Sequence, residues 1–315
     1  MKNFSDTTKG IFLIITSAFS FALMAAFARL AGDICFVQKA FFRNAVAFLI
    51  ALFSILHDIK KEGVASFVIP KGALLFLFLR SIAGSVGIFG NFYALDRLVL
   101  SDAAILNKMS PFFSILFSFF LLKEKIKKVP LIAIIVAFFA AMLVVKPSFN
   151  FSQCLPTLAG FAGGIGAGFA YACVRKLSKL GCKGKVIVLF FSGFSMLLSL
   201  PYMIFNYNPM TFKQLLFLLC AGFAAAGGQF SITAAYYYAP AAKISIYDYS
   251  QIIFSTLLGF FIFKMIPDFY SILGYVIIIA MALLNFLYNK KSHEQNLQIQ
   301  NPAVPDEKNH SKETE

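Results

Sequence analysis

Four ionisable side chains stand inside long apolar stretches of this sequence: Arg43, Arg80, Lys108 and Asp248. A charge at the middle of a bilayer costs about 2.5–3.5 kcal/mol on insertion scales, so such residues usually face a cavity or a partner. At about 1.5 Å per residue, Lys108 lies about 15 Å from the outer end of its stretch, near the middle of a hydrocarbon core roughly 30 Å thick. The other three lie within a turn or two of the middle. We expect them to face a cavity that binds charged groups, with a purely structural ion pair as the alternative.

Further polar residues are concentrated in KISIYDYSQ, residues 243–251. Lys243 lies near one end of its apolar segment, where a charge is readily tolerated, and Asp248 and Gln251 lie deeper. The neighbouring tyrosine rings can stack on a substrate ring or shield a cation. Helical spacing also places Arg80 and Asn91 on one face with two glycines. We predict that substrate is bound by Arg43, Arg80, Asn91, Asn107, Lys108, Tyr247, Asp248, Tyr249 and Gln251.

Other features favour structural roles. Gly160, Gly164 and Gly168 follow a small-xxx-small spacing, which is typical of helix packing. Pro111 either kinks its helix or exposes backbone to substrate at mid-depth. Basic residues near the ends of apolar stretches are expected to extend toward lipid headgroups, namely Arg29, Lys39 and Arg175.

The elements that must position these residues are membrane helices. Of 315 residues, 59% are hydrophobic and 13% charged, and the mean hydropathy is +0.79. A soluble domain of this size cannot hide so much apolar surface. The net charge of +14 arises largely from lysines in short stretches between apolar runs. Membrane orientation explains this distribution more simply than nucleic-acid binding does, so we expect no nucleic-acid partner. The five cysteines form no CxxC pair, so we expect no metal site, disulfide framework or cofactor.

Apolar segments bounded by charges or turn residues predict an all-α integral membrane protein with ten transmembrane helices. Loops after the even-numbered spans are rich in lysine, which predicts that both termini are cytoplasmic. Residues 1–9 form the cytoplasmic N-terminus, and 289–315 are expected to be a disordered cytoplasmic tail. The predicted spans are 10–31, 36–56, 71–95, 98–122, 129–145, 155–177, 185–205, 212–237, 240–263 and 267–288.

An internal repeat is visible at an offset of 141 residues, which aligns LLFL at 74–77 with LLFL at 215–218. Each copy holds five spans, an odd number, so residues 10–146 and 153–288 are expected to be inverted repeats about an axis in the membrane plane. Asn107 and Asp248 are mates in this alignment, as are Lys108 and Tyr249. We therefore expect Lys108 and Asp248 to lie at similar depth, in contact directly or through substrate.

Several motifs carry a resemblance to a known family. They are Arg43 early in the second span, Tyr93-Ala-Leu leading into Ser101-Asp-Ala-Ala, Pro111 before an apolar run ending Leu122-Lys-Glu124, and the counterparts Ala239-Pro-Ala-Ala and Phe263-Lys-Met-Ile-Pro-Asp268. In this order they resemble the EamA family of the drug/metabolite transporter superfamily, over about residues 10–288. The resemblance implies ten helices around a central cavity and the transport of small metabolites.

These features predict a secondary transporter or exchanger that moves a small polar organic metabolite across the bacterial inner membrane by alternating access. Three deep cations and one acid fit an amphoteric substrate such as an amino acid or S-adenosylmethionine. No phosphate-binding GxxxxGK[ST] loop is present, so ATP is not the direct driver. A coupling proton, a counter-substrate and a homodimer remain open. The alternative is an intramembrane lipid-processing enzyme, but no membrane-embedded histidine or paired acids supply catalytic residues, so we expect no enzyme.

Overall fold

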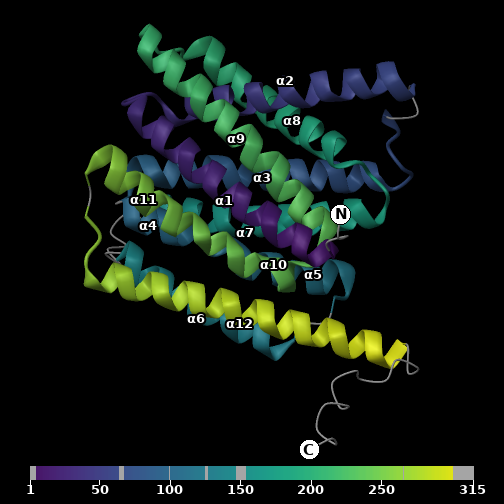
Figure 1. The fold of residues 1–315 in the computed structure, drawn as a ribbon. Coiled ribbons are helices and arrows are strands. Elements are labelled where there is room, and N and C mark those ends of the chain that lie inside the picture. The colour runs from purple at the N-terminus through teal and green to yellow at the C-terminus, as the bar shows by residue number, and fades with distance from the viewer. Residues whose placement is uncertain are drawn as a thin grey trace, which may run out of the picture.

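The computed structural model is a bundle of long helices (Figure 1). It describes residues 5–63, 67–98, 100–124, 127–146, 154–264 and 266–300, and every regular element in this part of the chain is helical. Ten segments are long and apolar enough to span a membrane, as predicted, so this is a multi-pass membrane protein. The helices are α1 (Asp6–Leu30), α2 (Phe36–Glu62), α3 (Ala73–Arg97), α4 (Leu100–Asn107), α5 (Ser110–Leu122), α6 (Lys128–Val145), α7 (Cys154–Lys179), α8 (Gly184–Phe205), α9 (Phe212–Tyr238), α10 (Ala241–Ile244), the 3₁₀ helix η2 (Ser245–Tyr249), α11 (Ser250–Phe263) and α12 (Phe269–Gln300).

Local sequence signals explain where several helices begin and end. The Ser5 side chain accepts a hydrogen bond from the Thr8 N–H at the start of α1. Thr211 and Gln214 form a capping box at the start of α9. α12 runs to Gln300, beyond the predicted boundary at 289, because this segment is free of Gly and Pro and contains good helix formers. Any disordered tail therefore starts later than predicted, and residues 301–315 lie outside the described part.

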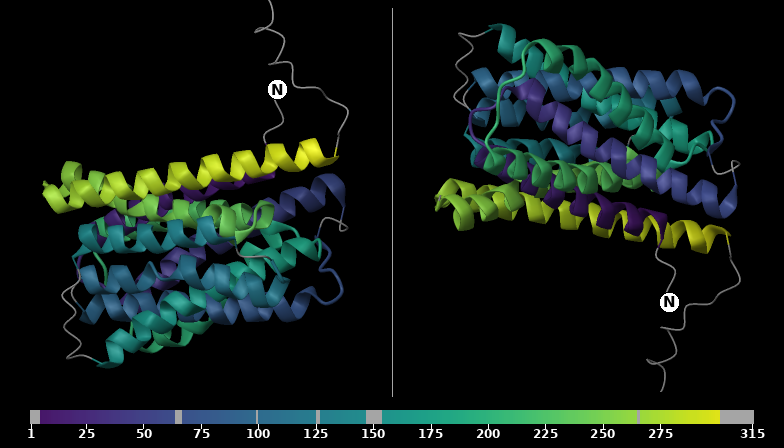
Figure 2. Two further views of the ribbon diagram at one scale, coloured as in Figure 1. Left: turned by 90° about the horizontal axis from the view of Figure 1, so that it is seen from below. Right: turned by 90° about the horizontal axis from the view of Figure 1, so that it is seen from above.

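The packing of the helices maps onto itself when the two halves are exchanged. α3 packs along α7 and α1 packs along α9, while α2 pairs with α8 at one edge and α6 with α12 at the other (Figures 1 and 2). Lys123 and Lys264, which are mates at the offset of 141, both end their helices in the left-handed conformation, with φ of 54° and 57°. The inverted repeat remains a prediction, which this correspondence supports.

The glycines of α7 allow close approach to its neighbours. A Cβ added to Gly164 would lie 2.6 Å from the carbonyl oxygen of Leu106, and one on Gly160 would lie 2.9 Å from the Leu106 side chain. The space beside Gly168 is occupied in the same way by Phe113 of α5. The predicted packing role of this stripe is therefore confirmed, and it seats α4 and α5 against α7.

The start of α1 and the end of α12 lie at the same end of the bundle, which we call the terminal end (Figure 1). There Arg175 donates to Glu124 Oε1 at 3.3 Å and to the Tyr237 carbonyl oxygen at 2.8 Å. The expectation that Arg175 extends toward headgroups is wrong, because these acceptors hold it inside the bundle. Glu124 also accepts an ion pair from Lys179.

At the opposite end, Lys146 pairs with Asp268, which joins the end of α6 to the start of α12. Asp268 also accepts hydrogen bonds from the backbone and side chain of Ser271. The hydrogen bond from Lys146, followed by those from Ser271, lowers the pKa of Asp268 to about 2.

Candidate functional site

The fourth predicted span is interrupted at mid-membrane. α4 ends at Asn107 and α5 begins at Ser110, so Lys108 and Met109 lie between the two helices. Pro111 has no N–H to donate to the Asn107 carbonyl, and the Phe112 N–H bonds to Met109 instead of Lys108. The Lys108 carbonyl is thereby released, and it accepts a hydrogen bond of 3.1 Å from the Tyr249 hydroxyl.

The ninth predicted span is interrupted at the corresponding position. After one turn of α10, the chain tightens into η2 before α11 resumes. Stretches of 3₁₀ helix inside a longer helix often mark functional positions, and paired interruptions in the two halves of a transporter point to its binding site. Asp248 lies in this interruption, with its side chain buried.

Lys108 joins the two interruptions. Its ammonium donates to Asp248 Oδ2 at 2.9 Å, to the Asp248 carbonyl oxygen at 3.1 Å and to Gln251 Oε1 at 2.7 Å. The predicted contact between Lys108 and Asp248 is confirmed. An ammonium has three N–H donors, so this one is fully satisfied. We call Lys108, Asp248, Gln251 and Tyr249 the lysine cluster.

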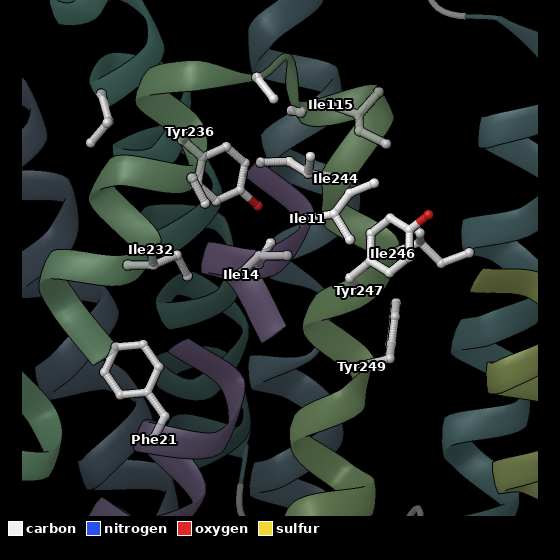
Figure 3. Close-up of a cluster of buried hydrophobic side chains, with 14 of the residues drawn as sticks. Ile11, Ile14, Phe21, Ile115, Ile232, Tyr236, Ile244, Ile246, Tyr247 and Tyr249 are labelled. Carbon is white, nitrogen blue, oxygen red and sulfur yellow. The ribbon is translucent and has the colours of Figure 1, made fainter. Parts of the chain in front are cut away.

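A chain of hydroxyl groups joins α5 through η2 to α9. Ser114 and Ser245 lie 2.9 Å apart, and the Tyr236 hydroxyl lies 3.1 Å from Ser245. Figure 3 shows Tyr236 among apolar side chains of α1, α9 and α10, such as Ile14, Ile232 and Ile244. The Tyr236 ring stacks on that of Tyr171 of α7, with ring centres 4.6 Å apart and planes inclined by 9°.

Arg80 of α3 has a different environment. Only 2% of it is exposed, and its guanidinium carbon lies 3.5 Å above the ring centre of Phe191 in α8. Its Nε and Nη1 atoms are buried and have no hydrogen-bond partner among the described residues. Arg43 of α2 lies above the ring of Phe21 at 5.6 Å and within electrostatic range of Arg80. We call Arg43, Arg80 and Phe191 the arginine cluster.

No carboxylate in the described part of the chain forms an ion pair with either arginine of this cluster. Tyr171 lies within electrostatic range of both arginines and of Asp248. The stacked pair Tyr171–Tyr236 is therefore close to members of both clusters. Among the described residues they form a central region with one neutralised ion pair and two cations that have no counter-ion.

Three predicted residues do not join these clusters through a hydrogen bond or ion pair among the described residues. Tyr247 is turned toward α12, where its hydroxyl donates to the Ala282 carbonyl at 3.1 Å (Figure 3). Asn91 lies where α3 packs against Gly163 of α7. Asn107 is the last residue of α4.

Residues that the sequence did not single out complete the region: Tyr171, Tyr236 and Phe191. A signal was present for Tyr236, because a buried tyrosine needs a hydroxyl partner and YYY at 236–238 precedes the polar stretch. Tyr171 and Phe191 gave no such signal, since aromatic residues are common throughout this chain. The described part contains no group of three His, Cys, Asp or Glu residues that could hold a metal ion.

Known proteins are similar to this chain along most of its length. The pseudopaline exporter of Pseudomonas aeruginosa is 28% identical over 276 residues, covering 87% of this chain and 94% of the exporter. An uncharacterized transporter of Helicobacter pylori is 26% identical over 282 residues, covering 87% and 93%. Human solute carrier family 35 member G1 is 25% identical over 296 residues, covering 86% and 77%.

The fold is also known. One solved crystal structure superposes with a TM-score of 0.76 at 15% identity, covering 90% of this chain and 98% of the other. At this identity the similarity shows the fold alone. The model of the EamA-like transporter family matches residues 8–146. In these residues the chain is similar to the EamA-like transporter family, the family whose motifs its sequence resembles.

Proposed function

We propose that this protein is a secondary transporter or exchanger that moves a small polar organic metabolite by alternating access. The observation that carries this proposal is the junction of two interrupted spans at Lys108, whose ammonium bonds to Asp248 and Gln251. Interrupted helices expose backbone groups and charges at mid-membrane, where transporters bind their substrates. The similarity to transporters from bacteria and humans supports the same class.

Alternating access gives the lysine cluster a function. Lys108 belongs to the first half of the chain and Asp248 to the second, so their ion pair joins the two halves when substrate is absent. A substrate that competes for either group would loosen this connection. Asp248 is also the group that would carry a coupling proton, or exchange partners with a counter-substrate.

The proposed substrate is amphoteric, for example an amino acid or S-adenosylmethionine. Its acidic group would meet the deep cations, and its amine or cationic centre would meet Asp248 and the tyrosine rings. Arg43, Arg80, Asn91, Asn107, Lys108, Tyr247, Asp248, Tyr249 and Gln251 are the proposed binding residues. The name of the pseudopaline exporter is compatible with a small organic solute and adds export as a direction to test.

We propose the bacterial inner membrane as the location, with both termini in the cytoplasm. Relatives in Pseudomonas and Helicobacter support a bacterial membrane. The terminal end of the bundle carries the lysine-rich loops, which favour the cytoplasmic side. An enzymatic function is less well supported, because the deep acid is paired with a lysine rather than with a second acid or a histidine.

The test begins with a thermal-shift screen of the purified full chain against metabolites, followed by uptake or counterflow of each hit in proteoliposomes. We expect Asp248→Asn to abolish transport while the protein still inserts into the membrane. Asp6→Asn is the matched control, because Asp6 is an exposed acid at the start of α1. Wild-type uptake by Asp248→Asn for every candidate would contradict the assignment.

A further inference from the structure

We propose that the arginine cluster is an oxyanion subsite, which takes a carboxylate or phosphate group of the transported solute. This inference rests on the proposed transport function and assigns one part of the substrate to one part of the site. It separates the arginine cluster, which binds the anionic group, from the lysine cluster, which connects the two halves of the protein.

Lys108 is not available for this role in the structure. Its three donors are taken by Asp248 Oδ2, the Asp248 carbonyl and Gln251 Oε1 at 2.7–3.1 Å. An anion could bind Lys108 only by displacing these acceptors. The charge of Asp248 would also repel an anion at this position.

Arg80 retains free donors. Its guanidinium lies flat on Phe191, so the ring covers one face and leaves the N–H groups at the edge. Nε and Nη1 lie in the guanidinium plane, and no described residue accepts a hydrogen bond from them. Each of them shares an edge of the guanidinium with Nη2, and the two N–H groups along such an edge match the two oxygens of a carboxylate or phosphate in a bidentate hydrogen bond.

Gly84 makes this position of Arg80 possible. It lies one turn along α3, and a Cβ added there would contact Arg80 Nη1 and lie 2.7 Å from the ring of Phe191. An alanine at this position would therefore displace the guanidinium from the ring without removing its charge. A substitution at the neutral residue Gly84 can therefore disturb the proposed subsite without changing its charge.

Arg43 supplies a second positive charge. It lies within electrostatic range of Arg80 and Tyr171, and no described carboxylate pairs with it. Two neighbouring cations that stay charged repel each other, so an anion between or beside them lowers the energy of both. Tyr171 also lies in range of Asp248, so a solute held at the arginines can extend across this ring toward the acid.

The subsite belongs to one half of the molecule. At the offset of 141, the mates of Arg43 and Arg80 are Gly184 and Ala221, and the mate of Gly84 is Ala225. The second half therefore contributes the acid and the first half the unpaired cations. A bound amphoteric solute would have a fixed orientation across the axis that relates the halves.

The test measures thermal unfolding of the purified full chain in detergent, with succinate or inorganic phosphate as probes. Dimethyl succinate and sodium chloride serve as the uncharged and ionic-strength controls. We expect a saturating rise of the unfolding midpoint, on the order of 5 °C at about one hundred times Kd. The rise should disappear in Arg80→Gln and shrink in Gly84→Ala.

Gly259→Ala is the matched control, because a Cβ at Gly259 meets nothing within 4 Å. It should respond to the probes as the wild type does. Arg80→Lys is a second variant that keeps the charge and loses the planar pair of donors, so its response should be weaker than that of the wild type. Equal responses in wild type and Arg80→Gln would overturn the subsite.

Added phosphatidylglycerol distinguishes a lipid headgroup from a solute. If only this lipid raises the midpoint, and Arg80→Gln abolishes that rise, the solute assignment is wrong. The thermal-unfolding measurement does not depend on transport. If a probe binds through Arg80 but the protein transports none of the metabolites tested, the proposed function is contradicted and the subsite is not. Full transport by Arg80→Gln of an anionic metabolite that the wild type carries would contradict the subsite alone.

Discussion

Lys108 and Arg80 are both buried cations in the middle of apolar helices, yet their surroundings differ. Every donor of the Lys108 ammonium faces an acceptor, and a carboxylate neutralises its charge. Arg80 has an aromatic ring beneath it and two buried N–H groups for which the described part of the chain offers no acceptor. A contact with an aromatic face contributes about 2 kcal/mol when desolvated. This is less than the several kcal/mol that burial of an unpaired ion costs.

The comparison teaches that depth in the membrane alone does not identify a binding residue. The lysine cluster is complete without a ligand, and its satisfied bonds join two interrupted spans. The arginine cluster is incomplete, and an anion would supply what it lacks. Residues with unsatisfied donors are the stronger candidates for ligand contact, because binding improves their environment.

The largest effect is expected when the lysine cluster loses its acid. Asp248→Leu leaves the Lys108 charge buried without a counter-ion, which should lower the free energy of unfolding by about 3–5 kcal/mol. The measurement is equilibrium unfolding of the purified protein in mixed micelles. Lys108→Met combined with Asp248→Leu should recover most of the loss, because no unpaired charge remains. If the unfolding free energy of Asp248→Leu alone lies within about 1 kcal/mol of that of the wild type, a tight ion pair is contradicted.

A smaller effect is expected from the hydroxyl that caps the interrupted fourth span. Tyr249→Phe leaves the buried Lys108 carbonyl without its donor, which should cost about 1–3 kcal/mol of unfolding free energy. Tyr207→Phe is the control, since Tyr207 is exposed in the loop before α9. Equal stability of the two variants would mean that the hydroxyl does not cap this carbonyl.

The smallest effect is expected at the exposed Lys146–Asp268 pair, where water replaces either partner. The pKa of Asp268 in the folded protein is about 2, below the unfolded value of about 3.9. Its contribution to stability is therefore present above about pH 4 and lost as the pH falls toward 2. Unfolding midpoints of wild type and Asp268→Asn should differ at pH 7 and converge near pH 2. A constant difference would rule out this titration.

The sequence predicted the spans well because membrane helices depend on local composition. It also predicted the contact of Lys108 with Asp248, because the repeat fixed their relative depth. It left open whether Pro111 interrupts the segment 98–122, and it treated 240–263 as one continuous helix, whereas both segments are interrupted. Pro111 was the visible signal in the first, and η2 has no comparable residue.

Other parts of the site depend on how each helix is rotated about its axis. That rotation follows from packing, as at Gly164 and Gly168, and cannot be obtained from residue types alone. The ring beneath Arg80, the stack of Tyr171 on Tyr236 and the turn of Tyr247 toward α12 are all of this kind. Arg175 was assigned to the headgroups because its partner Glu124 lies in the loop after α5, far from it in the sequence.

The difference between the two clusters is tested most directly by the stability of Arg80→Met and Lys108→Met without ligand. Both changes replace a buried cation by an unbranched apolar side chain. We predict that Lys108→Met lowers the free energy of unfolding, since it leaves Asp248 without a counter-ion, and that Arg80→Met leaves it unchanged or raises it. A loss in Arg80→Met as large as that in Lys108→Met would show that both cations are structural, and would contradict the distinction between the clusters.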